Sequence, residues 1–202
     1  MCTSPSAMPS RRRARALPFL LAALAPSGAA LAQDALVERI LAVVEGRPVL
    51  LSEVRLVQAL RGQDEKAALE ELIDERLMLR EAGRLAQSAV TAEEEERALG
   101  RLRETSPAAR AAGEAALRRL VRRQTAIVKY VDFRFRPQLS VSEEEVRAAY
   151  DRRYGGAAQP PAFTEAAPAL REELLAHALD LRIEAWVAEL RRSAEVRYNG
   201  AR

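Results

Sequence analysis

The stretch ILAVVEGRPVLLSEV, residues 40–54, differs from the rest of the chain, which has the apolar spacing and the capping residues of helices. Its first run of β-branched residues ends at Glu45 and Gly46, and glycine readily takes the positive φ that a tight hairpin turn requires. Pro48 has no N–H to donate to a neighbouring strand, so the returning strand is expected at a sheet edge. The stretch therefore predicts one small β-hairpin at the start of a mainly helical fold.

Helical spacing and capping residues follow the hairpin to near the end of the sequence. Helices are expected near residues 53–60, 65–86, 91–104, 107–113, 114–135, 142–154 and 164–193. Ser52 is expected to cap the first of these helices and Thr164 the last. Thr91 and Ser142 begin capping boxes, because a glutamate follows each of them three residues later.

Three of the predicted helices carry a wide apolar face, which predicts that this face is buried. The residues expected in these faces are Leu69, Leu72, Ile73, Leu77, Leu79 and Ala82, then Leu117, Leu120, Val121, Ile127, Val128 and Val131, and finally Leu170, Leu174, Leu175, Ala178, Leu181, Ile183, Trp186, Val187 and Leu190. Aromatic residues are few, so the core is expected to consist mostly of leucine, valine, isoleucine and alanine.

A short strand-like tail, residues 195–199, ends the predicted elements. A hairpin of two strands is marginally stable in water, and residues 196–198 can add a third strand to it. That pairing would join the two ends of the folded chain and make the helices between them one domain.

The first 32 residues have the parts of a secretory signal peptide. Arginines cluster at residues 11–15, a short apolar run follows at residues 17–24, and Ala30-Leu31-Ala32 supplies a cleavage pattern. The alternative is an uncleaved anchor, but the apolar run is shorter than the roughly 20 residues that a span needs. We expect export and cleavage, by a Sec or a twin-arginine route, and a periplasmic location.

Removal of the leader changes the charge and the cysteine content of the chain. Four of the 32 basic residues and none of the 29 acidic residues lie in the leader, which leaves 28 against 29 and a net charge of −1. A net charge near zero gives no general attraction to nucleic acid or to anionic lipid. Cys2 is the one cysteine, so the mature chain is expected to have neither disulfides nor zinc sites built on sulfur.

No arrangement of residues predicts a catalytic, cofactor or metal site. His177 is the one histidine, so no second imidazole or thiol can complete a metal site or a nucleophile–base pair. The acidic run at residues 93–96 and the basic run at residues 118–123 are interpreted as polar helix faces rather than as a cation site and a phosphate site. An enzyme that uses paired carboxylates would need a placed acid–base pair, which the sequence does not indicate. Binding through an apolar surface is the favoured kind of function.

Several motifs resemble, in the same order, those of SurA-type periplasmic chaperones. Residues 40–54 resemble the opening hairpin of that family, and LEELIDERLMLREA at residues 69–82 resembles its second helical signature. VSEEEV at residues 141–146 is similar to the segment that precedes the isomerase domain, and residues 163–198 are similar to the C-terminal helix and strand. The resemblance covers essentially the whole chain after the leader.

The resemblance also implies a domain organisation. It implies a SurA-like N-terminal helical domain over residues 33–154 and a C-terminal helix and strand over residues 163–202 that complete the same domain. Residues 155–162 form a linker at the place where members of this family carry a parvulin-type prolyl isomerase domain. The parvulin pocket uses paired histidines, and this chain has one, so we expect no isomerase activity and no other enzyme activity.

The function that the resemblance implies is that of an ATP-independent chaperone, which binds unfolded or partly folded exported proteins, outer-membrane proteins among them, in an apolar cradle. We expect no cofactor, no binding of nucleic acid and no stable membrane insertion after the leader is cleaved. Whether the protein forms a homodimer stays open. The candidate client-binding residues are Leu56, Tyr130, Phe133, Phe135, Tyr150 and Tyr154, each of which can instead belong to the core. The alternative function is an envelope scaffold or adaptor that binds one folded partner through the same surface.

Overall fold

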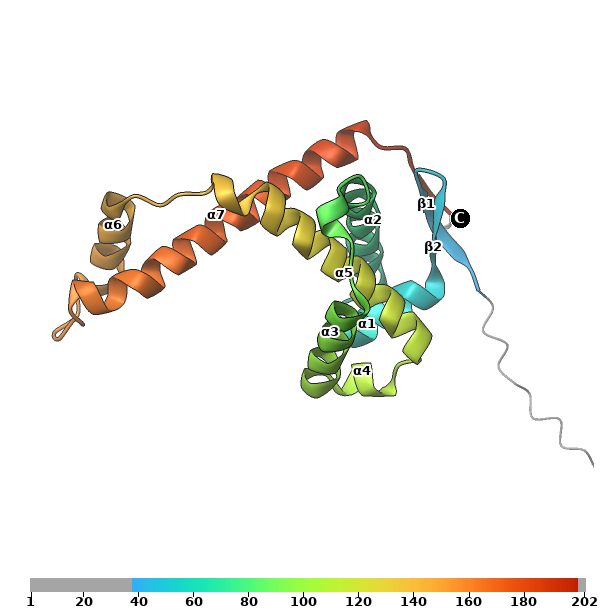
Figure 1. Cartoon of the computed structure of the whole chain (residues 1–202), viewed down its shortest axis with the longest axis horizontal. Coiled ribbons are helices and arrows are strands. Elements are labelled where there is room, and N and C mark those ends of the chain that lie inside the picture. Colours follow the sequence, from blue (N-terminus) through green and yellow to red (C-terminus); the bar gives the residue numbers. More distant parts are fainter. Residues whose placement is uncertain (1–37, 200–202) are drawn as a thin grey trace, which may run out of the picture. The chain divides into compact units, whose positions relative to one another are not determined.

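The computed structural model describes residues 38–199, which fold into seven α-helices and one small antiparallel sheet (Figure 1). The predicted leader, residues 1–32, lies outside the described residues. The elements in chain order are β1 (Ile40–Val44), β2 (Arg47–Leu50), α1 (Leu51–Arg61), α2 (Glu65–Ala82), the 3-10 turn η1 (Ala86–Ser88), α3 (Ala92–Thr105), α4 (Pro107–Ala111), α5 (Glu114–Arg134), the 3-10 turn η2 (Arg136–Gln138), α6 (Glu143–Tyr154), α7 (Phe163–Ser193) and β3 (Val196–Tyr198). The predicted mainly helical fold with a hairpin is confirmed. Within the described range, no helix combines the length and the apolar character needed to cross a membrane.

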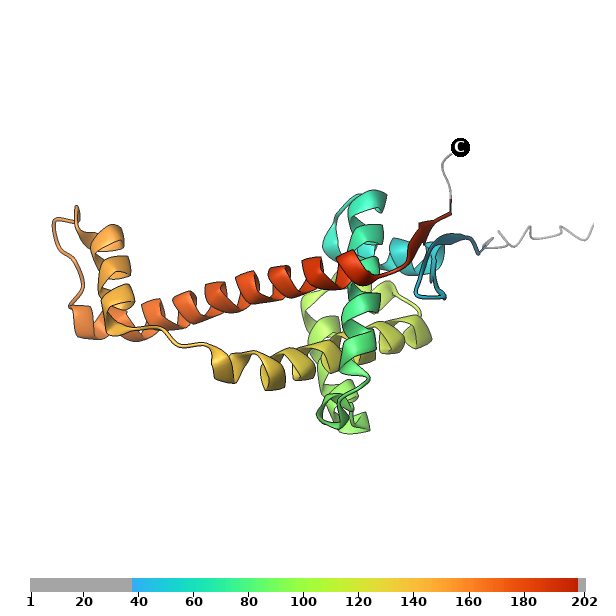
Figure 2. The same cartoon turned by 90° about the horizontal axis from the view of Figure 1, so that it is seen from above.

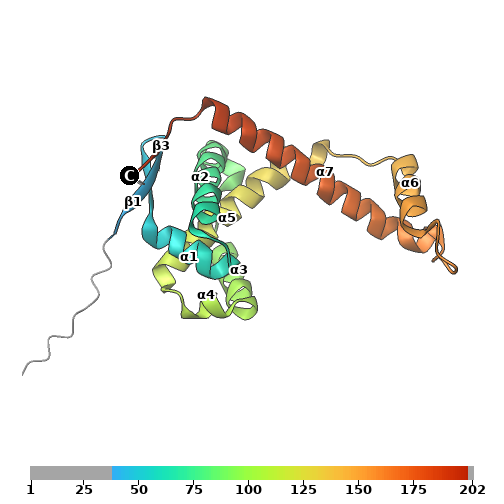
Figure 3. The same cartoon turned by 180° about the vertical axis from the view of Figure 1, so that it is seen from behind.

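The sheet contains the predicted hairpin and the predicted third strand, with β1 between β2 and β3 (Figure 3). Glu45 and Gly46 have φ values of 49° and 75°, as a tight turn with two left-handed residues requires. Pro48 lies on the edge strand β2, as its missing N–H predicts. β3 pairs with β1 in antiparallel register, and at its end the Asn199 N–H donates to the Leu41 carbonyl at 2.7 Å.

All seven predicted helices are present, but two predicted caps are wrong. α1 begins at Leu51, where the Glu53 carboxylate accepts a hydrogen bond from the Leu50 N–H at 3.2 Å. The hydroxyl of Ser52 instead donates to Glu38 at 2.6 Å. α7 has Ala162 as its N-cap, so Thr164 lies inside the helix.

The ends of the other helices follow local signals in the sequence. The capping boxes at Thr91 and Ser142 are both formed, with each hydroxyl accepting from a backbone N–H at 3.2 Å. α2 ends at Ala82, four residues before the predicted end, and Gly83 follows it. Glycine is a poor helix former, which explains the earlier end.

The main core lies between the sheet and helices α1, α2, α5 and α7. Its fully buried members include Val44 and Val49 of the hairpin and Leu72, Ile73 and Leu77 of α2. Burial was predicted from one-sided apolar patterns, and for two residues it is wrong: Val128 of α5 is 56% exposed and Leu181 of α7 is 53% exposed. On both helices the apolar side chains extend over a wider face than the neighbouring elements cover.

Helix α7 packs at both of its ends, as can be followed in Figure 2. Near its start, Ala167 and Leu170 pack with Val146 and Ala149 of α6. Near its end, Leu190 joins the main core. Between these ends, Leu179, Ile183 and Trp186 pack against a third buried cluster, Ile127, Val131 and Phe135.

A buried ionic network joins α1, α2 and α5. Glu75 is 4% exposed and pairs with Arg123. Glu53 lies 2.6 Å from Arg76 and 3.3 Å from Arg123, so two carboxylates and two guanidinium groups neutralise one another. Burial raises the pKa of Glu75, and Arg123 opposes this rise. Burying charged groups in the interior lowers the stability of the fold unless each group is paired with one of opposite charge.

We predict that Gly46→Ala lowers the free energy of unfolding by about 1 kcal/mol, because a Cβ at this left-handed residue is strained although no atom lies near it. The matched control is Gly100→Ala in α3, where the added Cβ also meets no atom. This control should raise the unfolding free energy by about 0.5–1 kcal/mol, because alanine favours helix. Urea unfolding measures both changes, and equal shifts in the two variants would contradict the assigned turn.

We also predict that Arg123→Met lowers the unfolding free energy by about 3 kcal/mol at pH 7, because it leaves the buried Glu75 carboxylate short of a partner. A carboxyl whose pKa is raised in the folded state stabilises below its unfolded pKa and loses that contribution as the pH rises. The loss should therefore be smaller at pH 4 than at pH 7, and adding Glu75→Gln should recover part of it. Urea unfolding at the two pH values tests this, and an equal loss at both would count against the assignment.

Candidate functional site: two cavities along α7

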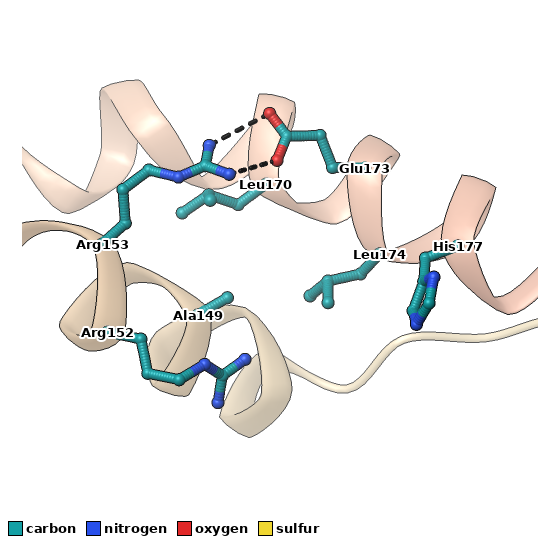
Figure 4. Close-up of a pocket in the computed structure, with 7 residues that line it drawn as sticks. All are labelled: Ala149, Arg152, Arg153, Leu170, Glu173, Leu174 and His177. Atoms are coloured by element: carbon teal, nitrogen blue, oxygen red, sulfur yellow. Dashed lines mark hydrogen bonds and ion pairs between the residues drawn. The ribbon is translucent and has the colours of Figure 1, made fainter.

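A cavity of about 400 Å³ lies between α6 and α7, and Figure 4 shows the side chains that line it. We call it the α6–α7 cavity, and its lining residues are Ala149, Arg152, Arg153, Leu170, Glu173, Leu174 and His177. The three residues from α6 and the four from α7 each follow helical spacing, so each set lies on one face of its helix. The linker before α7 brings these two faces together.

A second cavity, of about 500 Å³, lies between η2 and α7. We call it the η2–α7 cavity, and its lining residues are Arg136, Pro168, Arg171, Glu172, Leu175, Ala176, Leu179 and Asp180. An α-helix turns by about 100° per residue, which places these residues of α7 on the face opposite to the α6–α7 cavity. The stretch of α7 over residues 168–180 therefore has a cavity on each side.

The α6–α7 cavity has an apolar floor and a charged rim. Leu170 is 2% exposed and forms the floor together with Leu174, which is half-buried. On one side, Arg153 donates two hydrogen bonds to the two carboxylate oxygens of Glu173, at 3.0 and 2.6 Å (Figure 4). These bonds lower the pKa of Glu173, mainly through hydrogen bonding to Arg153. The arrangement suits the binding of an apolar group and provides no placed acid–base pair.

Two clusters of aromatic side chains flank the cavities. In the first, Trp186 of α7 stacks on Tyr130 with ring centroids 5.1 Å apart and meets Phe135 edge-on at 5.2 Å. In the second, Tyr150 lies 5.0 Å from Tyr154, and its hydroxyl donates to the carbonyl of Pro161 in the linker. Tyr150 also meets Phe163 of α7 edge-on at 5.5 Å. The first cluster therefore holds the end of α5 against α7, and the second holds α6 against α7.

The structure places the six candidate client-binding residues in different surroundings. Phe133 is 52% exposed, whereas Phe135 is 3% exposed and belongs to the core. Tyr130 and Phe135 share the first aromatic cluster, and Tyr150 and Tyr154 share the second. Leu56 lies elsewhere, in a small cavity between α1 and α5, so the structure does not bring it to the aromatic residues.

The leucines that line the two cavities were not among the candidates. Leu170 and Leu174 lie on one face of α7, and Leu175 and Leu179 lie on the other. One signal in the sequence could have indicated them: the apolar residues of this helix lie on two of its sides, whereas a helix that buries one face needs them on one side only. The sequence analysis assigned Leu170, Leu174 and Leu175 to the buried face and did not single out Leu179.

The charged runs that the sequence singled out pair with each other. Arg118 and Arg122 of α5 lie 3.2 and 3.4 Å from the Glu95 carboxylate of α3, and Lys129 donates to both carboxylate oxygens of Glu94 at 2.8 Å. Both runs therefore help to hold α3 against α5. Within the described part of the chain, no group of three or more metal-ligating side chains could hold a metal ion.

We predict opposite outcomes for two neighbouring aromatic residues. Phe135→Ala should lower the unfolding free energy by about 3–5 kcal/mol, because its ring is buried against Tyr130 and Trp186. Phe133→Ala should change it by less than about 1 kcal/mol, because the Phe133 side chain is exposed. Thermal and urea unfolding measure both, and a large loss for Phe133→Ala would contradict the observed exposure.

The sequence was also compared with known proteins. No protein-family model matches the chain, and no curated protein matches it. The candidate site is the stretch of α7 over residues 168–180, with the α6–α7 cavity on one face and the η2–α7 cavity on the other.

Proposed function

We propose that this protein is an exported, ATP-independent chaperone that binds unfolded proteins, outer-membrane proteins among them, and has no isomerase activity. The binding surface is the stretch of α7 over residues 168–180, with the α6–α7 cavity on one face and the η2–α7 cavity on the other. Unfolded segments expose apolar side chains at irregular intervals, and several shallow cavities can accept such side chains without a fixed sequence.

The observation that carries this proposal is the partial cover of α7 over residues 168–180, where both cavities lie. Leu170 and Leu190 are buried, whereas Leu175 and Leu179 between them are half-buried and line a cavity. Leu179 also packs against the buried cluster of Ile127, Val131 and Phe135, so its cover is partial. A helix whose middle served only the core would have these leucines covered. Each cavity offers a few apolar contacts, so each interaction is weak and a client can be released without ATP.

The resemblance to SurA-type chaperones supports the same proposal. It implies an N-terminal hairpin that meets a C-terminal strand, and β1 and β3 pair in this way. The linker between α6 and α7 joins two helices that pack directly on each other, in the place where the family carries its isomerase domain. The proposed periplasmic location depends on the leader-like residues 1–32.

The test is the aggregation of an unfolded outer-membrane β-barrel protein, diluted from urea without ATP and followed by light scattering. Suppression is expected near stoichiometric amounts of the purified protein. Leu174→Gln combined with Leu175→Gln should weaken suppression several-fold, because it makes both cavities polar. The matched control is Leu181→Gln, which changes an exposed leucine of α7 outside both cavities.

Thermal unfolding must show that all the variants remain folded at the temperature of the assay. If the double variant suppresses aggregation as fully as the wild-type protein, the two cavities are not the binding surface. Absence of suppression by the folded wild-type protein, together with stoichiometric binding of one folded envelope protein, would replace the chaperone with an adaptor.

A further inference from the structure

The charge at the α6–α7 cavity is not balanced. Glu173 is the one acidic residue that lines the cavity, and its two hydrogen bonds to Arg153 use both of its carboxylate oxygens. Arg152, one residue before Arg153, has no carboxylate within ion-pair distance among residues 38–199 and is exposed. One positive charge therefore remains at the cavity without a partner.

The unpaired charge lies beside apolar side chains. Figure 4 shows Arg152 from α6 and His177 from α7 bordering the space into which Ala149 and Leu174 point. His177 is exposed, so its ring nitrogens can donate to an acceptor that enters the cavity. A ligand that fits this site therefore carries an apolar group next to an anionic or hydrogen-bond-accepting group.

We propose that the α6–α7 cavity binds segments of unfolded proteins in which an acidic side chain lies next to large apolar side chains. The apolar side chain rests on Leu170, Leu174 and Ala149, and the carboxylate pairs with Arg152. The volume of about 400 Å³ lies within the roughly 300–1,000 Å³ of ligand cavities. This inference rests on the proposed function and adds a charge preference to it.

The η2–α7 cavity makes this preference specific to one face of α7. Glu172 and Asp180 line that cavity together with Arg136 and Arg171, and Arg136 is already paired with Asp132 at 2.9 Å. Acidic and basic groups are thus mixed there, and no net preference for acidic segments is expected. The two faces of one helix then differ in the charge of the segments that they accept.

The experiment measures the binding of two short peptides by fluorescence anisotropy with an uncharged dye. Both peptides have blocked ends and contain leucine and phenylalanine, and they differ only in carrying aspartate or lysine. The purified protein should bind the aspartate peptide about fivefold or more tightly than the lysine peptide, as one partly exposed ion pair allows. Arg152→Glu should reverse this order, and Arg152→Gln should abolish it.

The matched control is Arg101→Glu on α3, which makes the same change of net charge outside the cavity at an exposed residue. It should leave the order of the two peptides unchanged. Circular dichroism and thermal unfolding establish that each variant is folded, since a glutamate in the last turn of α6 opposes the helix dipole.

The possible outcomes separate this inference from the proposed function. If the protein suppresses aggregation but binds both peptides equally, or if Arg152→Glu leaves their order unchanged, the inference is wrong and the chaperone proposal stands. If the protein neither suppresses aggregation nor binds either peptide, both are wrong. Displacement of the aspartate peptide by dodecanoate at an equal concentration would reassign the cavity to free amphiphilic carboxylates and would overturn the peptide proposal.

Discussion

The pairing of β3 with β1 is the constraint on which the rest of this fold depends. The Glu45 N–H donates to the Glu195 carbonyl at 2.9 Å, which connects two residues at opposite ends of the described chain. Just before this strand, Arg191 of α7 pairs with Asp74 and lies 2.7 Å from Glu70, both on α2. The end of α7 is therefore held on both the sheet and α2, and its other end packs on α6.

The sequence predicted those parts of the fold that depend on neighbouring residues along the chain. Gly46 indicated the turn, Pro48 the edge strand, and Thr91 and Ser142 the starts of two helices, all of which are confirmed. The prediction that Ser52 caps the first helix was wrong, because the Ser52 hydroxyl donates a hydrogen bond to Glu38, which lies 14 residues earlier. Capping propensity is local, whereas the choice of hydrogen-bond partner depends on the tertiary fold.

The candidate site was harder to predict for a similar reason. A leucine that lines a cavity and a leucine that fills the core have the same pattern along one helix, and the coverage by other helices decides between them. That coverage differs between Leu190, which is buried in the main core, and Leu175, which faces the η2–α7 cavity. Burial also separates Phe133 from Phe135, which are two residues apart and equally apolar.

The position of β3 has a consequence for the order in which the chain folds. The hairpin is among the first folded elements to be synthesised, whereas its third strand, Val196–Tyr198, is the last. Contacts between residues so far apart in sequence form slowly, because a large loop must close before they stabilise the chain. The sheet therefore stays incomplete, with one edge of β1 unpaired, until residues 196–198 have been made. During that interval the protein is itself a chain with an exposed strand edge, of the kind that pairs with other unfolded chains.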